Sequence, residues 1–501
     1  MPPTLKSEII TYSAPEDAGS YAGAKIFVNG QEIFVYEIMV NKSHTWNAQA
    51  PNRMGAGFAY FDFEGYAEVK IIFENLIEKA VIRPLGYQVQ SNIKGDEINF
   101  KLYIQADYVI EPDGDSQKAI HLFCNRIEKN APQKDDPDVI YFDKGLHTSK
   151  NSPYINSNNQ IILSDNTTVY IAGGAVVQAG FIANDKKNIS ILGRGIIDGS
   201  VFIRDVSNYQ WKLPFEFNYC NNINLKDVII SDPAGWCIQY YFTKDSTIDG
   251  LKMISSRSNG DGISLQSCQN ISVKDCFVRT WDDSLVVKNY PDFRNRDIQG
   301  TTKNIAFENC VLWTDLAQSM EIGYETVGEV MENIIFENIT VLHNFHKPVM
   351  SIHNGNNAHI KNVVYKNITV EDASMGQGDA GSNCQLIDIN IKYNSIWSDQ
   401  HSITSLGEID GVVFENIIVI DGNSYIPISI FGSMDTRKKY NNSIHIVKNI
   451  TLKDIAIINT QLTMSYKYFY TNQYTQNINI FHSQTVPSGA SYPTTNYRYS
   501  G

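Results

Sequence analysis

Near the N-terminus, hydrophobic and polar residues alternate as they do in strands that have one buried face. The alternation is clear at residues 98–104, and also at residues 25–28 and 33–36, which flank Asn29-Gly30. Asn-Gly between two apolar runs is a strong signal for a two-residue hairpin. The pattern therefore predicts antiparallel β-structure with close to no helix.

A polar stretch at residues 128–138, rich in Lys, Asp and Pro, separates this part from the rest of the chain. Stretches of this kind often join domains, because few contacts cross them. We therefore expect two domains, an N-terminal antiparallel β-sandwich over residues 1–135 and a larger domain over residues 136–501.

The second domain contains a repeat with the unit Asn-Ile-x-apolar-x-Asn/Asp, which returns at steps of about 28 to 49 residues. Copies begin at Asn188, Asn222, Asn270, Asn304, Asn333, Asn362, Gly411 and Asn449. Short strands repeated without helices between them indicate a solenoid, whose coils stack at the strand spacing of about 4.8 Å. Asn suits a tight turn because it tolerates left-handed backbone, and stacked Asn side chains can pair with each other.

The sequence thus predicts an all-β chain in which a parallel β-helix follows the sandwich. A β-propeller is the main competitor, but its blades need four antiparallel strands and about 40 residues each. The single repeated motif and its uneven steps favour the β-helix. The longer steps are expected to contain a degenerate copy or a long loop.

The composition says little about the fold but helps to exclude some classes of partner. The chain has 501 residues and a net charge of −13. This charge argues against nucleic acids and anionic membrane surfaces, and mildly disfavours a polyanionic substrate. The 28 Tyr residues suit sugar binding as well as core packing. The seven Cys residues show no zinc-ligand spacing, so we expect most of them to be buried apolar fillers.

Three aspartates stand out within the repeats. Asp261 follows Asn259-Gly260, and Asp282 and Asp283 come about one coil later, so Asp261 and Asp282 are expected on adjacent coils of one face. Carboxyl groups in close proximity raise the pKa of at least one of them. One can then donate a proton while another accepts one, as cleavage of a glycosidic bond requires. Since neighbouring strand residues point to opposite faces, Asp282 and Asp283 can share a site only at a bulge or turn.

The same residues also have structural interpretations. Asn-Gly-Asp-Gly is a common turn sequence, and an Asp-Asp pair can be a calcium ligand or part of a solvated turn. Spacing alone therefore leaves the catalytic and the structural interpretations open.

The segment resembles the polygalacturonase and dextranase superfamily, glycoside hydrolase families 28 and 49. Those families carry an Asn-x-Asp-Gly element, matched here at residues 259–262, and an Asp-Asp pair about one coil later, matched by Asp282 and Asp283. The resemblance implies a right-handed parallel β-helix and hydrolysis with inversion. It also implies that Asp282 is the general acid and that Asp261 and Asp283 hold and activate the attacking water. Neither a metal ion nor a cofactor is expected.

Two departures from the galacturonase pattern concern the substrate. Galacturonases carry Gly-His-Gly where Gln318 stands at the His place, and an Arg-x-Lys that grips a substrate carboxylate where residues 351–354 read Ser-Ile-His-Asn. The layout is most similar to that of the dextranase and isopullulanase family, which also has a β-sandwich before its helix. We therefore expect a polysaccharide or oligosaccharide substrate, first a neutral α-glucan such as dextran and second a pectin-type chain.

Residues near the motif are candidates for substrate binding, each with a structural alternative. A Trp can stack on a sugar or pack in the core, Lys288 fits a salt-bridged residue slightly better, and His353 fits a structural histidine better. The full set is Asn259, Trp236, Trp281, Lys288, Gln318, Glu321, Tyr324 and His353.

Two other functional classes stay open. A β-helix lyase or epimerase would need a proton-abstracting base and neutralisation of a uronate, and no Lys/Arg cluster of that kind stands out in the sequence. A carbohydrate-binding or adhesin β-helix would need no catalytic group. The chain shows no signal pattern, so the protein is either intracellular or has lost its signal peptide. We expect the second, a secreted or periplasmic protein, because polymers are usually hydrolysed outside the cell.

Overall fold

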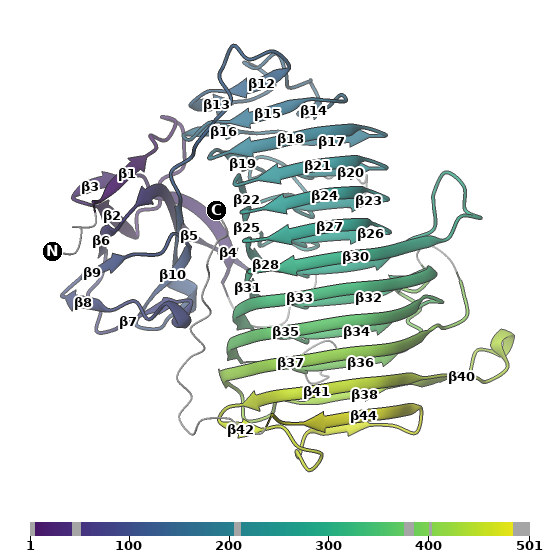
Figure 1. Ribbon diagram of the computed structural model, residues 1–501. Coiled ribbons are helices and arrows are strands. Elements are labelled where there is room, and N and C mark those ends of the chain that lie inside the picture. The colour runs from purple at the N-terminus through teal and green to yellow at the C-terminus, as the bar shows by residue number, and fades with distance from the viewer. Residues whose placement is uncertain (1–5, 43–51, 205–211, 375–384, 400–402, 484–501) are drawn as a thin grey trace.

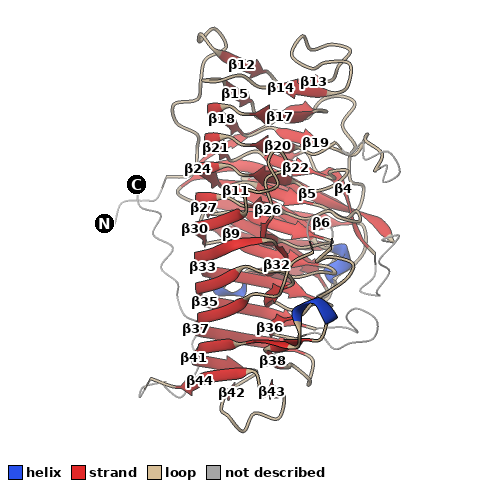
Figure 2. Cartoon of the chain, turned by 90° about the vertical axis from the view of Figure 1, so that its right-hand side faces the viewer, coloured by secondary structure: helices blue, strands red, loops and turns tan. Residues whose placement is uncertain are grey.

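The computed structural model describes residues 6–42, 52–204, 212–374, 385–399 and 403–483. Two sheets near the N-terminus, antiparallel except for one parallel strand pair, lie beside a tall stack of parallel strands (Figure 1). Almost every regular element is a strand, as the view from the side shows (Figure 2). The prediction of an all-β chain with a parallel β-helix after an antiparallel part is therefore confirmed.

The N-terminal part contains a six-stranded and a five-stranded sheet whose facing apolar side chains form one core. The six-stranded sheet contains β1 (Glu8–Thr11), β4 (Tyr36–Asn41), β5 (Arg53–Glu64), β7 (Ala80–Arg83), β10 (Asp107–Pro112) and β11 (Ile120–Asn125). The five-stranded sheet contains β2 (Ala24–Val28), β3 (Gln31–Ile33), β6 (Ala67–Phe73), β8 (Ser91–Lys94) and β9 (Glu97–Leu102). Two short 3₁₀ helices, η1 (Leu85–Tyr87) and η2 (Ser116–Lys118), lie in the connections.

The predicted hairpin is present between β2 and β3. Asn29 and Gly30 have φ values of 47° and 81°, the left-handed conformation that a two-residue turn between right-twisted strands requires. The second strand ends earlier than the sequence predicts, because Tyr36 already belongs to β4, which pairs with β5 in the other sheet. The alternating segment forms β9, but it ends at Leu102, and Ile104 lies outside the strand and is exposed.

The parallel stack consists of a 20-stranded and an 11-stranded sheet. The 11-stranded sheet contains β14 (Gln160–Ile162), β17 (Gly180–Asn184), β20 (Phe215–Asn218), β23 (Ile238–Tyr241), β26 (Ile263–Gln266), β29 (Leu285–Asn289), β32 (Met320–Thr326), β34 (Met350–Asn354), β36 (Ile387–Ile391), β38 (Ile428–Phe431) and β43 (Phe469–Thr471). The predicted division at residue 135 falls in the connection between β11 and the first strand of the stack, and the division itself stays a prediction.

The 20-stranded sheet supplies the other two sides of the coils. Its members are β12 (Val139–Phe142), β13 (Gly145–His147), β15 (Thr168–Ile171), β16 (Ala175–Val177), β18 (Lys187–Gly193), β19 (Ile196–Asp198), β21 (Asn221–Lys226), β22 (Ile229–Ser231), β24 (Lys244–Asp249), β25 (Lys252–Ile254), β27 (Gln269–Lys274), β28 (Phe277–Thr280), β30 (Gly300–Glu308), β31 (Val311–Thr314), β33 (Gly328–Asn344), β35 (His359–Ala373), β37 (Glu408–Gly422), β41 (Val447–Ile457), β42 (Thr460–Gln461) and β44 (Thr475–Phe481). A small hairpin of β39 (Ser433–Asp435) and β40 (Ser443–His445), with η4 (Lys438–Tyr440) between them, projects from the stack.

Both Asn positions of the repeat sit at turns with left-handed backbone. Asn304 and Asn367, one from each position, have φ values of 55° and 54°. Asn304 Nδ2 donates to Asn270 Oδ1 on the preceding coil at 2.8 Å, and Asn367 Nδ2 donates to Asn338 Oδ1 at 2.9 Å. The predicted pairing of stacked Asn side chains is therefore confirmed. The long step after Asn222 contains a degenerate coil strand, β24, with Asp245 at the Asn position.

The interior of the β-helix is a continuous apolar column. Phe307, Phe336, Tyr365 and Phe414 occupy the same register on successive coils, and their ring centroids are 4.8 to 4.9 Å apart. All six described Cys side chains are buried and none forms a disulfide, whereas Cys384 lies outside the described residues. Burial of the described Cys confirms their role as apolar fillers.

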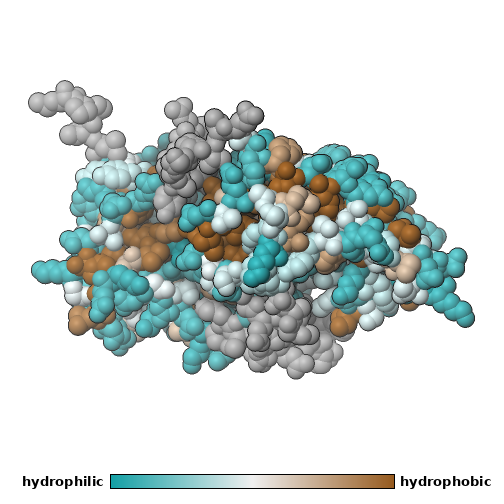
Figure 3. All heavy atoms as spheres, turned by 90° about the horizontal axis from the view of Figure 1, so that it is seen from below, coloured by the Kyte–Doolittle hydropathy of each residue, from teal (hydrophilic) through white to brown (hydrophobic). Residues whose placement is uncertain are grey.

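The last coil leaves apolar side chains at the end of the stack. Met464, Tyr470 and Phe481 are exposed there. Seen from below, the surface shows a broken band of hydrophobic residues between hydrophilic ones (Figure 3). Within the described ranges, no helix has the length and apolar character that crossing a membrane requires.

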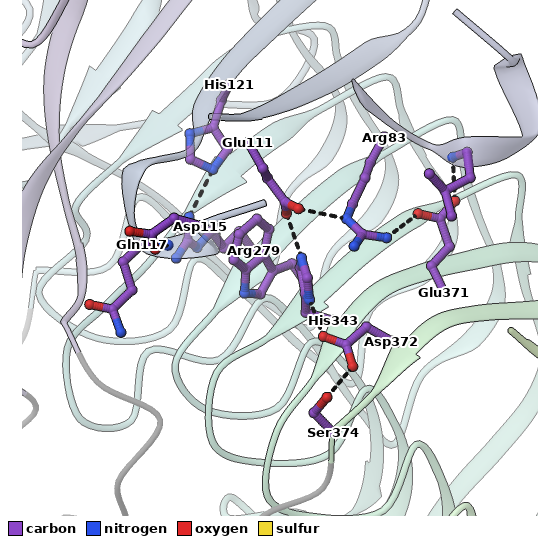
Figure 4. A network of polar contacts seen from close by, with 12 residues as sticks. Arg83, Glu111, Asp115, Gln117, His121, Arg279, His343, Glu371, Asp372 and Ser374 are labelled. Carbon is purple, nitrogen blue, oxygen red and sulfur yellow. Dashed lines mark hydrogen bonds and ion pairs between the residues drawn. The ribbon is translucent and has the colours of Figure 1, made fainter. Parts of the chain in front are cut away.

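The sandwich packs against the β-helix through an apolar layer with an ionic network at its edge. In the apolar layer Phe123 of the sandwich lies 5.3 Å from Phe277 of the β-helix, centroid to centroid. In the network, Glu111 of β10 accepts hydrogen bonds from Arg83 at 3.0 Å and from His343 at 2.5 Å (Figure 4).

The same network extends along the β-helix. His343 Nδ1 also bonds Asp372 Oδ2 at 2.7 Å, and Arg83 bonds Glu371 at 2.8 Å (Figure 4). Burial alone would lower the pKa of His343, but its hydrogen bonds with Asp372 and Glu111 hold that pKa above the ordinary value. His343 therefore bridges two carboxyl groups, Glu111 from the N-terminal sheets and Asp372 from the β-helix, and both favour its protonated form.

We expect the substitution Glu111→Gln to weaken the packing of the sandwich on the β-helix. Removing one charge of a buried, hydrogen-bonded group leaves the others uncompensated, and this typically costs about 3 kcal/mol of unfolding free energy. Chemical denaturation measures the change. Lys134→Ala is the control, because its ion pair with Asp143 is exposed, and it should leave the stability nearly unchanged. Equal stability of the two variants would contradict the inferred role of the network.

Candidate active site

The aspartates lie in the turns that lead into the 11-stranded sheet. Asp261 stands two residues before β26, Asp283 two residues before β29, and Gln318 two residues before β32. Backbone hydrogen bonds align these turns, since Gly262 N donates to Asp283 O at 2.8 Å and Ser284 N donates to Gln318 O at 2.9 Å. Asp261, Asp283 and Gln318 therefore form a column on three consecutive coils.

This register corrects one detail of the sequence prediction. The sequence spacing placed Asp261 and Asp282 on adjacent coils of one face, but the coil partner of Asp261 is Asp283. Asp282 stands beside the column, in a turn outside the regular strands. Such a turn is what allows two consecutive residues, Asp282 and Asp283, to share one site. Its Oδ1 accepts a hydrogen bond from the backbone N of Asp283 at 3.2 Å.

A chain of buried hydroxyl groups supports this turn. Thr280 Oγ1 donates to the carbonyl of Asp282 at 2.7 Å and lies 2.7 Å from Ser284 Oγ. Ser284 Oγ lies 2.8 Å from Thr314 Oγ1, which lies 2.8 Å from Ser319 Oγ. Because a hydroxyl group can donate and accept at the same time, this chain connects Thr280 and Ser284, on either side of the aspartate pair, to Thr314 on the next coil.

The three carboxyl groups act on each other electrostatically. Burial, followed by the charges of Asp282 and Asp283, raises the pKa of Asp261 well above its ordinary value. Burial, followed by the charges of Asp282 and Glu321, raises the pKa of Asp283 to about 7. The group therefore retains a proton near neutral pH, and that proton belongs to the coupled set.

Lys288 lies one coil beyond Asp261 on the outer face of the sheet. Its Nζ is 3.2 Å from Glu325 Oε2 and 5.4 Å from the centre of the Trp236 ring. Burial alone would lower the pKa of Lys288, but Glu325 and the nearby acids hold that pKa well above its ordinary value. Lys288 is a buried, paired cation, in agreement with the salt-bridge interpretation.

A second ionic chain follows on the next coils. His353 Nδ1 lies 2.8 Å from Glu321 Oε1, and His353 Nε2 lies 3.0 Å from Asp388 Oδ2. The Tyr324 ring stacks on the imidazole with 4.3 Å between centroids. Burial alone would lower the pKa of His353, but Glu321 and the other neighbours raise it well above the ordinary value.

The structure gives three of the other predicted residues a contact with charged groups of the site and buries the fourth. Trp236 reaches the site through its contact with Lys288, and Gln318 donates its backbone N–H to Asp283 Oδ1 at 3.1 Å. Asn259 accepts a hydrogen bond from Arg204. Trp281 is 3% exposed, so its ring is buried in the ligand-free protein.

Sequence reasoning missed Arg204. Its pKa is lowered mainly by burial, while the charges of Asp282 and Asp261 act in the opposite direction, which places the guanidinium beside both carboxylates. Arg204 comes from a loop two coils earlier, and no motif marks it. Across the described part of the chain, no group of three or more His, Cys, Asp or Glu side chains is arranged to hold a metal ion.

Residues 140–376 match the family model described as glycosyl hydrolases family 28. The matched residues run from β12 to β35 of the β-helix. A probable polygalacturonase from Vitis vinifera is 20% identical over 158 residues, which are 31% of this chain and 32% of that protein. The match thus spans about a third of the length of that relative.

One solved structure shares the fold over nearly the whole chain. Dex49A from Penicillium minioluteum is 14% identical with a TM-score of 0.59, over 94% of this chain and 96% of that chain. A family 28 exopolygalacturonase from Yersinia enterocolitica is 12% identical with a TM-score of 0.45, over 95% of this chain and 96% of that chain. The likeness to Dex49A supports the two-part fold.

We expect the raised pKa of Asp283 to make the protein less stable as pH increases. The folded state keeps a proton that the unfolded state releases between the ordinary pKa of 3.8 and about 7, so stability falls across that window. Asp283→Asn removes this dependence. Melting temperatures at pH 4 and pH 8 should differ less in the variant than in the unaltered protein.

Asp143→Asn is the matched control, because Asp143 is exposed and the N–H of Lys144 lowers its pKa. Its pH dependence between pH 4 and pH 8 should equal that of the unaltered protein. A variant Asp283→Asn with the same dependence would mean that Asp283 is ionised throughout the range.

Proposed function

We propose that the protein is an inverting glycoside hydrolase that cleaves a neutral α-glucan such as dextran. The observation that carries the proposal is the gathering of Asp261, Asp282 and Asp283 at one end of strands β26 and β29. Coupled carboxyl groups provide both the acid and the base that glycosidic cleavage needs. The family 28 match and the two-part layout support the same class of reaction.

In the proposed mechanism Asp282 donates a proton to the glycosidic oxygen as the bond to the anomeric carbon breaks. Asp261 and Asp283 hold a water molecule on the opposite side of the sugar ring and accept its proton. Burial and mutual repulsion keep a proton within the group up to near neutral pH. The same repulsion makes the ionised members stronger bases.

The paired cations favour a neutral substrate. Glu325 offsets the charge of Lys288, and Glu321 and Asp388 offset that of His353. His353 also stands in the region where galacturonases carry their Arg-x-Lys. The carboxylate of a uronate would therefore find no cation that is not already paired with an acid of the protein, among Lys288 and His353. It would also lie next to three aspartates, which would repel it.

A pectin-type chain is the second candidate, because the family 28 match and the Vitis vinifera relative favour it. Release of reducing sugars from dextran, other α-glucans and polygalacturonate separates the two. Ultraviolet absorbance of an unsaturated product would instead indicate a lyase, and binding without turnover would indicate a carbohydrate-binding protein. Cleavage of polygalacturonate alone would contradict the neutral substrate. We propose a location outside the cytoplasm, where such polymers are found.

We expect Asp282→Asn to lower turnover on the best substrate of this panel at least about a hundredfold, the usual contribution of a general acid. The melting temperature should change little, because Asn keeps the size of Asp. Asp143→Asn should retain full activity. Full turnover of the Asp282 variant would remove that residue from the mechanism.

The configuration of the first product provides an independent test. Proton NMR during the early reaction should show the anomer opposite to that of the cleaved bond, since water attacks directly in an inverting mechanism. A product that keeps the original configuration would require a covalent intermediate and a different role for Asp283.

A further inference from the structure

Strand β26 carries two buried polar side chains on its outer face. Ile263 and Leu265 point into the apolar column, so Ser264 and Gln266 point outward from the coil. They are only 0% and 1% exposed. Neither Ser264 Oγ nor Gln266 Nε2 has a hydrogen-bond partner among the described residues.

A third unpaired donor lies across the same strand. Trp236 comes from the coil before β26 and Lys288 from the coil after it, and the two side chains meet. The Trp236 side chain therefore lies on the side of the coils from which Lys288 projects. Its Nε1 is also buried without a hydrogen-bond partner in the described part of the chain. The three unpaired donors thus come from two adjacent coils, and Ser264 and Gln266 follow Asp261 closely along the chain.

Unpaired donors of this kind are uncommon in folded proteins. Buried polar groups nearly always have a partner, because an unsatisfied donor loses its hydrogen bonds to water without replacement. Gln239, on the adjacent strand β23, follows this rule, since its Nε2 donates to Asn218 Oδ1 at 3.0 Å. Gln239 and Gln266 are thus neighbours on the same face, but only Gln239 has its amide N–H paired.

We propose that Ser264, Gln266 and Trp236 form a subsite that binds the hydroxyl groups of one neutral sugar unit of the substrate. The N–H groups of Gln266 and Trp236 donate to ring hydroxyl oxygens, and Ser264 donates or accepts. Trp236 is the coil neighbour of Asp261, which places this sugar unit beside the carboxyl groups. The inference rests on the proposed function and assigns specificity to these three residues.

The charges around the subsite match a neutral unit. Lys288 Nζ lies 5.4 Å from the centre of the Trp236 ring, and its charge is offset by Glu325. Asp261 and Asp283 act on Lys288 from the other side. A carboxylate at this place would be repelled by these acids, whereas a hydroxyl group uses the unpaired donors without adding charge.

Binding to a catalytically inactive protein tests the subsite apart from the chemistry. Isothermal titration calorimetry of the Asp282→Asn variant with dextran-derived oligosaccharides gives the reference affinity. Adding Gln266→Met should weaken binding about tenfold, the scale expected when a site loses a hydrogen bond to a substrate hydroxyl. Trp236→Phe, which keeps a ring and removes the N–H, should also weaken binding. Ser429→Ala, on the same face in a later coil, is the control and should bind like the reference.

The melting temperature provides the second measurement, and the substitution that weakens binding is not expected to lower it. In the ligand-free protein, Gln266→Met removes an unsatisfied buried donor, so the melting temperature should stay equal or rise. Gln239→Met breaks a hydrogen bond that is present and should lower it. A purely structural Gln266 would behave like Gln239.

The outcomes separate the two proposals. Unchanged affinity in the Gln266 variant, or a fall in its melting temperature like that of Gln239→Met, would overturn the subsite. The reference protein could instead bind oligogalacturonides and not neutral oligosaccharides, with weaker binding in the Gln266 variant. In that case the three residues do bind the substrate, but the proposal of a neutral sugar is wrong.

Discussion

Parallel pairing of each coil with the next in fixed register is the constraint on which the rest of the structure depends. It aligns the Asn turns into hydrogen-bonded ladders, stacks the aromatic side chains inside the coils and brings Asp261 above Asp283. The same pairing turns a local sequence pattern into a spatial one. Residues that are distant along the chain become neighbours because each strand edge satisfies its backbone groups on the preceding coil.

Much of the fold could be predicted because the turns need particular residues. The Asn positions adopt left-handed backbone, which few side chains tolerate, so the repeat is visible in the sequence. The hairpin at Asn29 and Gly30 was visible for the same reason. The end of the second hairpin strand was not, because β4 joins the other sheet, a choice made by tertiary packing. Periodicity alone cannot distinguish one sheet from the other.

The candidate site was predictable only in part. The motif identified the three aspartates, but chain spacing suggested the wrong coil partner for Asp261. The turn around Asp282 is set by the hydroxyl chain from Thr280 to Ser319, and Ser and Thr are too common to signal such a role. Arg204 and Gln266 escaped notice because nothing in their local sequence differs from an ordinary loop or strand. Their importance arises from neighbours on other coils.

The uneven length of the coils has a consequence for how relatives of this protein are recognised. A loop between two coils can lengthen, as the β39–β40 hairpin does, without moving the strands that follow. The number of residues between two site residues can therefore differ from coil to coil, while the stacking of the coils keeps their positions in space close. Searches that expect a fixed gap between conserved letters will overlook such homologues, and comparison by coil position will recover them.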